Sequence, residues 1–445
     1  MVGRFWSNKL EVSQVLSDTP VRFQCERSDD VPLGQFVTEN VPELADGAVD
    51  WLSPFLFNGH LQTAFTALAS FDDINQINYK RLMLKYPDGG VGALDVAVRD
   101  PEESESKYVP EGQNPIEALN AKMPGKFYTY FEPGDARLQS DDTKPMLIAL
   151  HGLTGGSHES YVRSMINKLQ NNYGFEACVL NSRGCCNSSI STAQLYNGGW
   201  TNDIRFCVRQ LRSMYPNRKF YMIGFSLGAS ILTNYLGEEG DKSDIEMAIA
   251  FGTPFDLMES SRCISESRVG SRLYSPTLSQ NLLNLVKRHE DALSKNDTFR
   301  LTYEAYANNI KNVTKFDDLF TGPMFGYKDA ADYYKNASSF QRLPGIRTPY
   351  IAVNAIDDPI VGYQSWLDSH FKSNPYTLLV KTTVGGHIAW FKNLSGNRWY
   401  TDPCCKLLAV YHEMIASGKH AVIPEMTALP QEKVSPVKTT YVDDL

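Results

Sequence analysis

The sequence predicts an α/β fold in which a mainly parallel central sheet carries helices on both faces and a helical lid is inserted late in the chain. Two observations predict this class. From residue 126 onward, short apolar segments alternate with segments of helical periodicity, as in a parallel sheet covered on both faces. Between Pro254 and Leu343 the alternation stops for a stretch too long for an ordinary loop, so a helical insertion is expected there.

The strands of this sheet are predicted from short runs rich in apolar and β-branched residues, and the helices from apolar residues repeating every three or four positions. The predicted strands are Lys126–Phe131, Met146–Leu150, Ala177–Asn181, Lys219–Ile223, Ile245–Phe251, Tyr350–Asn354 and Thr377–Lys381. The predicted helices are Ser157–Asn171, Trp200–Met214, Ser226–Leu236 and Asp402–Ser417.

The ends of the chain are less regular. Residues 1–75 are expected to form an N-terminal extension that packs on the core, and the apolar segment 51–65 has a mixed period that does not decide between helix and strand. From Tyr79, two alternating runs flank a Pro-Asp-Gly-Gly turn and predict a hairpin. The expected division is therefore a core at 76–253 and 344–420, a lid at 254–343 and a loose tail at 421–445.

Composition narrows the class of protein. The 445 residues are 42% hydrophobic and 21% charged, which is ordinary for a globular chain with a large core. A net charge of −8 argues against general electrostatic binding of nucleic acid. The first 20 residues lack the apolar run of a signal peptide, and the eight cysteines have no CxxC spacing, as expected of reduced thiols. We therefore expect an intracellular, cytoplasmic protein without a transmembrane segment.

The most informative motif is Gly224-Phe225-Ser226-Leu227-Gly228, which follows a predicted strand and precedes a predicted helix. In this strand–turn–helix context, G-x-S-x-G places a serine on a sharp, exposed turn, where it acts as a nucleophile. A serine hydroxyl needs a histidine to take its proton and a carboxylate to orient that histidine. Ser226 is therefore the candidate nucleophile, and its partners are expected downstream.

Among the histidines after Ser226, only His387 lies in a glycine-flanked loop directly after a predicted strand, so it is the candidate base. Two adjacent carboxylates, Asp357 and Asp358, follow the preceding strand. The position of Asp358 directly before the turn at Pro359 favours it as the acid, although the sequence leaves Asp357 open as the alternative.

Acyl transfer also requires hydrogen-bond donors for the oxyanion that forms in the transition state. The expected donors are the backbone N–H of Leu227, directly after the nucleophile, and that of Leu153, in the glycine-rich loop after the strand at 146–150. We find no His/Cys cluster with metal spacing and no nucleotide-binding glycine loop, so neither a metal nor a cofactor is expected.

Taken together, these motifs resemble those of the α/β-hydrolase superfamily, and within it the AB hydrolase 4 family. The similarity is strongest to the fungal branch that holds monoacylglycerol lipases and medium-chain fatty acid ethyl ester synthase/esterases, and it spans about residues 60–390. The motifs that carry it are HLQTAF at 60–65, HGLTGGSHESYVR at 151–163, NSRGCC at 181–186, GFSLGAS at 224–230, NYLGEEGDKS at 234–243, NAIDDPIVG at 354–362 and GGH at 385–387.

This resemblance implies an α/β-hydrolase fold, the catalytic residues Ser226, Asp358 and His387, and a lipid ester substrate, either a monoacylglycerol or a fatty acid ethyl ester. We therefore expect a serine hydrolase of medium- and long-chain carboxylic esters, in first place a monoacylglycerol lipase. An acyl-CoA:alcohol acyltransferase and a non-catalytic lipid-binding protein stay open as alternatives. Peripheral contact with a membrane or a lipid droplet also stays open, and the oligomeric state is not predicted.

Overall fold

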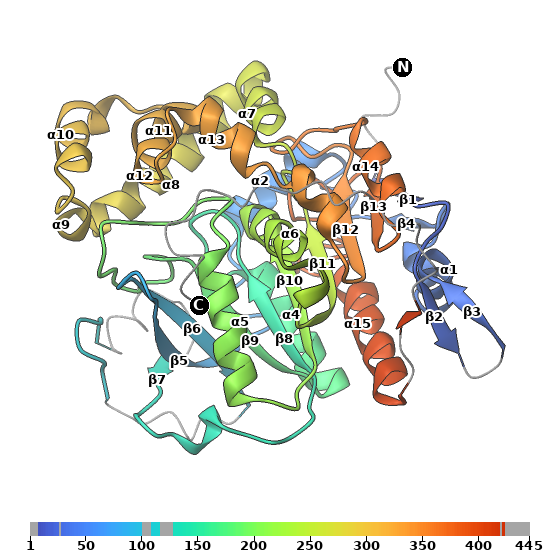
Figure 1. The fold of residues 1–445 in the computed structure, drawn as a ribbon. Coiled ribbons are helices and arrows are strands. Elements are labelled where there is room, and N and C mark those ends of the chain that lie inside the picture. Colours follow the sequence, from blue (N-terminus) through green and yellow to red (C-terminus); the bar gives the residue numbers. More distant parts are fainter. Residues whose placement is uncertain (1–7, 26–27, 100–107, 116–127, 419–420, 423–445) are drawn as a thin grey trace.

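The central feature of the structure, a computed structural model, is a large twisted sheet (Figure 1). The structure describes residues 8–25, 28–99, 108–115, 128–418 and 421–422. Eleven strands of this described chain form the sheet. Their order is β4 (Val49–Trp51), β1 (Lys9–Leu16), β13 (Thr377–Thr382), β12 (Tyr350–Ala355), β11 (Ile245–Phe251), β10 (Phe220–Phe225), β8 (Met146–Leu150), β9 (Glu176–Asn181), β6 (Val91–Val98), β5 (Asn78–Lys85) and β7 (Tyr128–Tyr130).

The middle of the sheet, from β13 to β9, is parallel throughout. Every residue of β8 and of β10 is buried, which explains why these strands read as continuous apolar runs in the sequence. The mainly parallel sheet predicted from the sequence is thus confirmed. The segment predicted as Lys126–Phe131 contributes β7, at the edge of the sheet, while residues 126 and 127 lie outside the described part.

Four helices that pack on this sheet are connected two by two through ion pairs. Helices α4 (Ser160–Tyr173) and α15 (Thr401–Ala416) are joined by Lys168 and Asp402, whose Nζ and Oδ1 atoms are 2.7 Å apart. Helices α5 (Asn202–Met214) and α6 (Leu227–Glu239) are joined by Arg205 and Glu238, at 2.8 Å. These are the four helices expected from sequence periodicity.

The N-terminal residues contribute elements that the sequence pattern did not reveal. Strand β1 pairs antiparallel with β13, with Val12 opposite Thr382, and buries Leu10, Val12 and Val15. The undecided segment at 51–65 contains the start of helix α2 (Gly59–Leu68), whose first turn is capped by Asn58. Helix α1 (Leu33–Asn40) and a small sheet of β2 (Arg22–Cys25), β3 (Ser28–Pro32) and β14 (Ala421–Val422) complete this region.

The chain between β11 and β12 is helical, and Figure 1 shows most of its helices gathered beside the sheet. It contains α7 (Leu257–Glu266), α8 (Ser275–Arg288), α9 (Glu290–Leu293), α10 (Asp297–Tyr306), α11 (Val313–Phe316), α12 (Gly322–Met324) and α13 (Ala330–Ala337); α14 (Leu367–Ser373) follows β12. Among the described residues, no helix combines the length and apolar character needed to span a bilayer. Most of the expected tail, residues 423–445, lies outside the described part.

A buried ion pair lies within the hairpin of β5 and β6. Arg81 on β5 and Asp95 on β6 are fully buried and face each other in the register, with Nε–Oδ1 and Nη2–Oδ2 distances of 2.6 and 2.8 Å. Asp95 also accepts hydrogen bonds from Ser157 and Asn181, which lie in the loop after β8 and at the end of β9. This carboxylate therefore links the hairpin to the loops that surround the candidate site.

We predict that Arg81→Met destabilises the protein by about 3–5 kcal/mol, because it leaves the Asp95 carboxylate buried without its counterion. The control is Arg99→Met, since the Arg99 side chain is 51% exposed in its ion pair with Glu176 and such a pair contributes about 0–1 kcal/mol. Urea unfolding followed by tryptophan fluorescence compares the two. Equal stability losses in both variants would contradict the importance of this ion pair.

Candidate active site

Ser226 occupies a strained turn between β10 and α6. Its backbone angles are φ 52° and ψ −120°, a combination that residues other than glycine rarely adopt. The glycines on either side make this turn sterically feasible. A Cβ atom on Gly224 would lie 2.7 Å from the carbonyl oxygen of Gly228, and one on Gly228 would lie 2.4 Å from that of His151. The two glycines are therefore required by close packing, Gly224 against the start of α6 and Gly228 against the loop after β8.

Ser226, His387 and Asp358 form a continuous chain of hydrogen bonds. The Oγ atom of Ser226 lies 2.8 Å from Nε2 of His387, and Nδ1 of His387 lies 2.8 Å from Oδ2 of Asp358. The acid is 3% exposed, and its second oxygen accepts the backbone N–H groups of Ile360 and Val361. A buried carboxylate held in this way can fix the orientation of the imidazole, which in turn can accept the proton of the serine hydroxyl.

The three residues come from the carboxyl ends of three strands of the parallel sheet. Ser226 follows β10, Asp358 follows β12 and His387 follows β13. Because parallel strands end at the same edge of a sheet, residues far apart in the sequence meet there. The structure thus brings together the three positions selected from the sequence.

The neighbouring carboxylate, Asp357, points to the backbone of the histidine loop. Its Oδ1 atom accepts the N–H groups of Gly385 and Gly386, at 2.9 and 3.0 Å. Burial, together with the nearby charge of Asp358, raises the pKa of Asp357 to about 6, although the hydrogen bonds from the backbone lower it. Of the two adjacent acids, Asp358 is the one in contact with the imidazole.

The two expected oxyanion donors, Leu153 and Leu227, line the same cavity as Ser226. In the loop after β8, the N–H groups on either side of Leu153 are occupied, since Gly152 donates to the Tyr161 hydroxyl and Thr154 to that of Tyr196. Within the described residues, the N–H of Leu153 has no such acceptor. Leu227 is the first residue of α6, where backbone N–H groups have no partner inside the helix.

His151, at the start of the same loop, is committed to structural contacts. Its Nδ1 donates to the carbonyl of Gly152 and its Nε2 accepts the N–H of Ser182, at 2.7 and 3.0 Å. Burial lowers its pKa to about 4, so the ring is neutral at physiological pH. This histidine joins the loop after β8 to the end of β9 and has no contact with the hydroxyl of Ser226.

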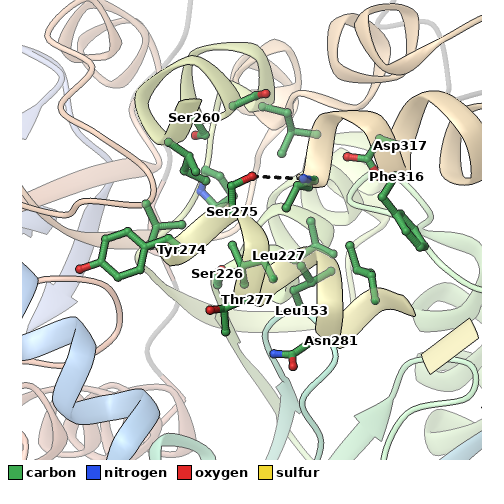
Figure 2. A pocket seen from close by; sticks show the side chains of 18 of the residues that line it. Leu153, Ser226, Leu227, Ser260, Tyr274, Ser275, Thr277, Asn281, Phe316 and Asp317 are labelled. Carbon is green, nitrogen blue, oxygen red and sulfur yellow. Dashed lines mark hydrogen bonds between the residues drawn. The ribbon is translucent and has the colours of Figure 1, made fainter. Parts of the chain in front are cut away.

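An apolar cavity of about 420 Å³ contains Ser226 and His387 in its wall. Figure 2 shows Ser226, Leu227 and Leu153 facing this cavity, with Tyr274 and Phe316 of the helical segment 254–343 around them. Helix α2 supplies another part of the wall. The apolar lining from the helical segment includes Leu257, Ile264, Leu273, Leu278, Leu282, Leu285, Val313, Phe316, Phe320, Met324 and Phe325.

The composition of the cavity fits a long apolar group. Most of the residues in its wall carry aliphatic or aromatic side chains. In the described part of the chain, no group of three or more His, Cys, Asp or Glu side chains is arranged to hold a metal ion. The chemistry available at Ser226 is therefore that of an activated hydroxyl beside a lipophilic cavity.

Comparison with known proteins identifies the family. Residues 145–394 match the family model described as alpha/beta hydrolase fold. The chain is 50% identical over 443 residues to the monoacylglycerol lipase of Saccharomyces cerevisiae, which covers 98% of both chains. It is 32% identical over 417 residues to the medium-chain fatty acid ethyl ester synthase/esterase 2 of the same yeast, covering 88% of this chain and 92% of the relative. This chain belongs to the α/β-hydrolase family.

Proposed function

We propose that this protein is a serine hydrolase that cleaves carboxylic esters of medium- and long-chain fatty acids, with monoacylglycerols as its main substrates. The observation that carries the proposal is the hydrogen-bonded chain from Ser226 through His387 to Asp358 in the wall of an apolar cavity. The extent and identity of the match to the yeast monoacylglycerol lipase support the choice of substrate.

In the proposed reaction, His387 Nε2 takes the proton of the Ser226 hydroxyl while the Oγ atom attacks the ester carbonyl. The tetrahedral intermediate carries its negative charge on the former carbonyl oxygen, which the N–H groups of Leu153 and Leu227 stabilise. When the C–O bond breaks, His387 gives the proton to the departing glycerol oxygen and the acyl group stays on Ser226. A water molecule, deprotonated by His387, then releases the fatty acid and restores the serine. Asp358 stays ionised and orients the imidazole throughout.

The helical segment 254–343 acts as a lid in this proposal, because it supplies most of the apolar wall that would hold the acyl chain. An acyl-enzyme formed beneath it can also react with an alcohol in place of water. The synthase/esterase relative favours this second candidate function, an acyl-CoA:alcohol acyltransferase. The hydrogen-bonded triad argues against a protein that only binds lipid, since binding alone does not require an oriented serine, histidine and aspartate.

The mouth of the cavity has the properties of a lipid-binding surface. Leu68 of α2 and Leu273 of the lid both line the cavity and are 84% and 52% exposed. Arg268 and Arg272, which precede Leu273 in the sequence, are exposed, whereas the acidic side chains of the preceding helix are paired with Arg262. Exposed apolar residues continuous with an acyl cavity, together with cationic side chains, fit an anionic lipid surface. We therefore propose that this surface binds a membrane or a lipid droplet.

We also propose that the protein acts inside the cell. Seven of the eight cysteines are free thiols, and six of these are buried. Unpaired thiols of this kind are typical of proteins in a reducing compartment.

The first prediction from this proposal concerns the nucleophile. Ser226→Ala should lower kcat for ester hydrolysis by at least about 10³-fold, because no acyl-enzyme can form. Release of fatty acid is measured with monoacylglycerols and with fatty acid ethyl esters of graded chain length, and we expect the parent protein to act fastest on monoacylglycerols. Faster turnover of ethyl esters, or net ester synthesis from acyl-CoA and ethanol, would favour the acyltransferase. A folded parent protein that is as inactive as the variant on every ester would contradict the proposal.

The second prediction concerns the acid. Asp358→Asn should lower kcat by about 10³–10⁴-fold with little change in the melting temperature, because an amide at this position favours the wrong tautomer of His387. Kinetics on a soluble short-chain ester give kcat and KM separately. Unchanged kcat in the folded variant would exclude Asp358 as the triad acid.

The third prediction concerns the lipid surface. Arg268→Glu combined with Arg272→Glu should weaken binding to vesicles of phosphatidylcholine and phosphatidylserine by about 10-fold or more, since each cation near an anionic surface contributes about 1 kcal/mol. Sedimentation with vesicles measures the binding. Because neither arginine lines the cavity, hydrolysis of a soluble short-chain ester serves as the control and should match the parent. Equal vesicle binding by the parent and the double variant would contradict the assignment of this surface.

A further inference from the structure

The backbone that carries His387 is held by three successive N–H groups. Gly385 and Gly386 donate to Oδ1 of Asp357, and His387 donates to Oγ1 of Thr63, at 2.9 Å. Thr63 lies on α2, 324 residues before His387 in the sequence. Two side chains from other segments, Asp357 and Thr63, thus accept the hydrogen bonds of the backbone N–H groups at and directly before His387.

This loop needs external support because its backbone departs from ordinary conformations. Gly386 has a φ of 63°, and Ile388 and Trp390 have φ values of 47° and 49°, which are unfavourable for residues with a Cβ atom. Strained backbone of this kind persists only where the surrounding structure fixes it. Hydrogen bonds from Asp357 and Thr63 supply such fixation directly beside the catalytic ring.

Close packing brings the same three segments together. A Cβ atom on Gly386 would lie 2.6 Å from the carbonyl oxygen of Gly59 and 2.8 Å from Oγ1 of Thr63, and one on Gly59 would lie 2.0 Å from the carbonyl oxygen of Asp357. The start of α2, the acid loop and the histidine loop are therefore in direct contact. Neither glycine could be replaced without displacing the backbone that orients His387.

The Asp357 carboxylate interacts with backbone N–H groups: those of Gly385 and Gly386, and that of Gly59 at the start of α2. Its side chain does not line the cavity, and the imidazole of His387 is bonded to the neighbouring Asp358. Burying a carboxylate costs free energy unless hydrogen bonds compensate it, and these glycine N–H groups provide that compensation. The adjacent acids thus have different contacts: Asp358 binds the imidazole ring of His387, and Asp357 binds the backbone directly before it.

We propose that Asp357 and Thr63 are positioning residues that hold the loop of His387 so that its Nε2 atom reaches the Ser226 hydroxyl. The inference rests on the proposed function of the Ser226 site. It predicts that loss of either acceptor impairs proton transfer more than substrate binding, since misplacement of a catalytic group by about 1 Å can lower the rate about 100-fold.

The test compares Asp357→Ala with Asp357→Asn, and Thr63→Val with Thr63→Ser. The amide oxygen of asparagine and the hydroxyl of serine can still accept the backbone hydrogen bonds, whereas alanine and valine cannot. Two rates are measured for each protein: turnover of a soluble p-nitrophenyl ester, and modification of Ser226 by a small fluorophosphonate. Titration with the same fluorophosphonate gives the concentration of active sites.

We expect Asp357→Ala and Thr63→Val to lower kcat per active site and the rate of modification by about 10- to 100-fold. For Asp357→Ala, which does not alter the cavity wall, KM should change by less than about 3-fold, as expected when transition-state positioning is lost and binding is not. Asp357→Asn and Thr63→Ser should recover most of both rates. If Asp357→Ala does not fold, the threonine pair and Asp357→Asn still decide the result.

Three results would overturn the inference. The first is parent-like kcat and modification rates in both Asp357→Ala and Thr63→Val. The second is a fall in the titrated active fraction and melting temperature with unchanged kcat per active site, which would indicate a role in stability alone. The third is failure of the parent protein itself to react with the fluorophosphonate, which would overturn the proposed function and the inference with it.

Discussion

Parallel strands bring their carboxyl ends to one edge of a sheet, and the candidate active site depends on this geometric constraint. The loop after β8 supplies one expected oxyanion donor, Leu153, and the turn after β10 supplies the serine and the other expected donor, Leu227. The loops after β12 and β13 supply the acid and the histidine. The hydrogen bond between Ser226 and His387 spans 161 residues of sequence at a distance of 2.8 Å. It requires the register of the buried parallel strands, and for that reason the stability of the sheet and the proposed chemistry are coupled.

At this edge, several residues adopt backbone conformations that are locally unfavourable. Ser226 and Ile388 both have positive φ values without being glycine, and each such residue costs of order 1–3 kcal/mol. The surrounding packing compensates this cost. Gly228 lies against the loop of His151, and Gly386 lies against α2. The same packing fixes the turn of the serine and the loop of the histidine, whose Oγ and Nε2 atoms lie 2.8 Å apart.

The sequence predicted those features whose cause is local. G-x-S-x-G reflects contacts within one turn and its neighbouring loop, and the acid and base follow apolar strands that are visible as short buried runs. The preference for Asp358 before Pro359 also has a local basis, because its Oδ1 accepts the N–H groups of the following turn. The triad positions chosen from the sequence are brought together in the structure, while their catalytic roles stay a prediction.

Features that depend on distant contacts were not visible in the sequence. Strand β1 alternates over only eight residues and is stabilised by pairing with β13, more than 360 residues away. Helix α2 follows a segment interrupted by Pro54, and its contact with His387 has no sequence signature. The different tasks of Asp357 and Asp358 likewise follow from the position of the glycine pair in space.

The most direct test of the account is mass spectrometry of the protein after rapid mixing with a long-chain monoacylglycerol and acid quenching. The account predicts that the peptide containing Ser226 gains the mass of the fatty acyl group minus one hydrogen, and that the gain disappears as the substrate is consumed. Acylation of a different residue, or steady hydrolysis during which Ser226 never carries an acyl group, would contradict it.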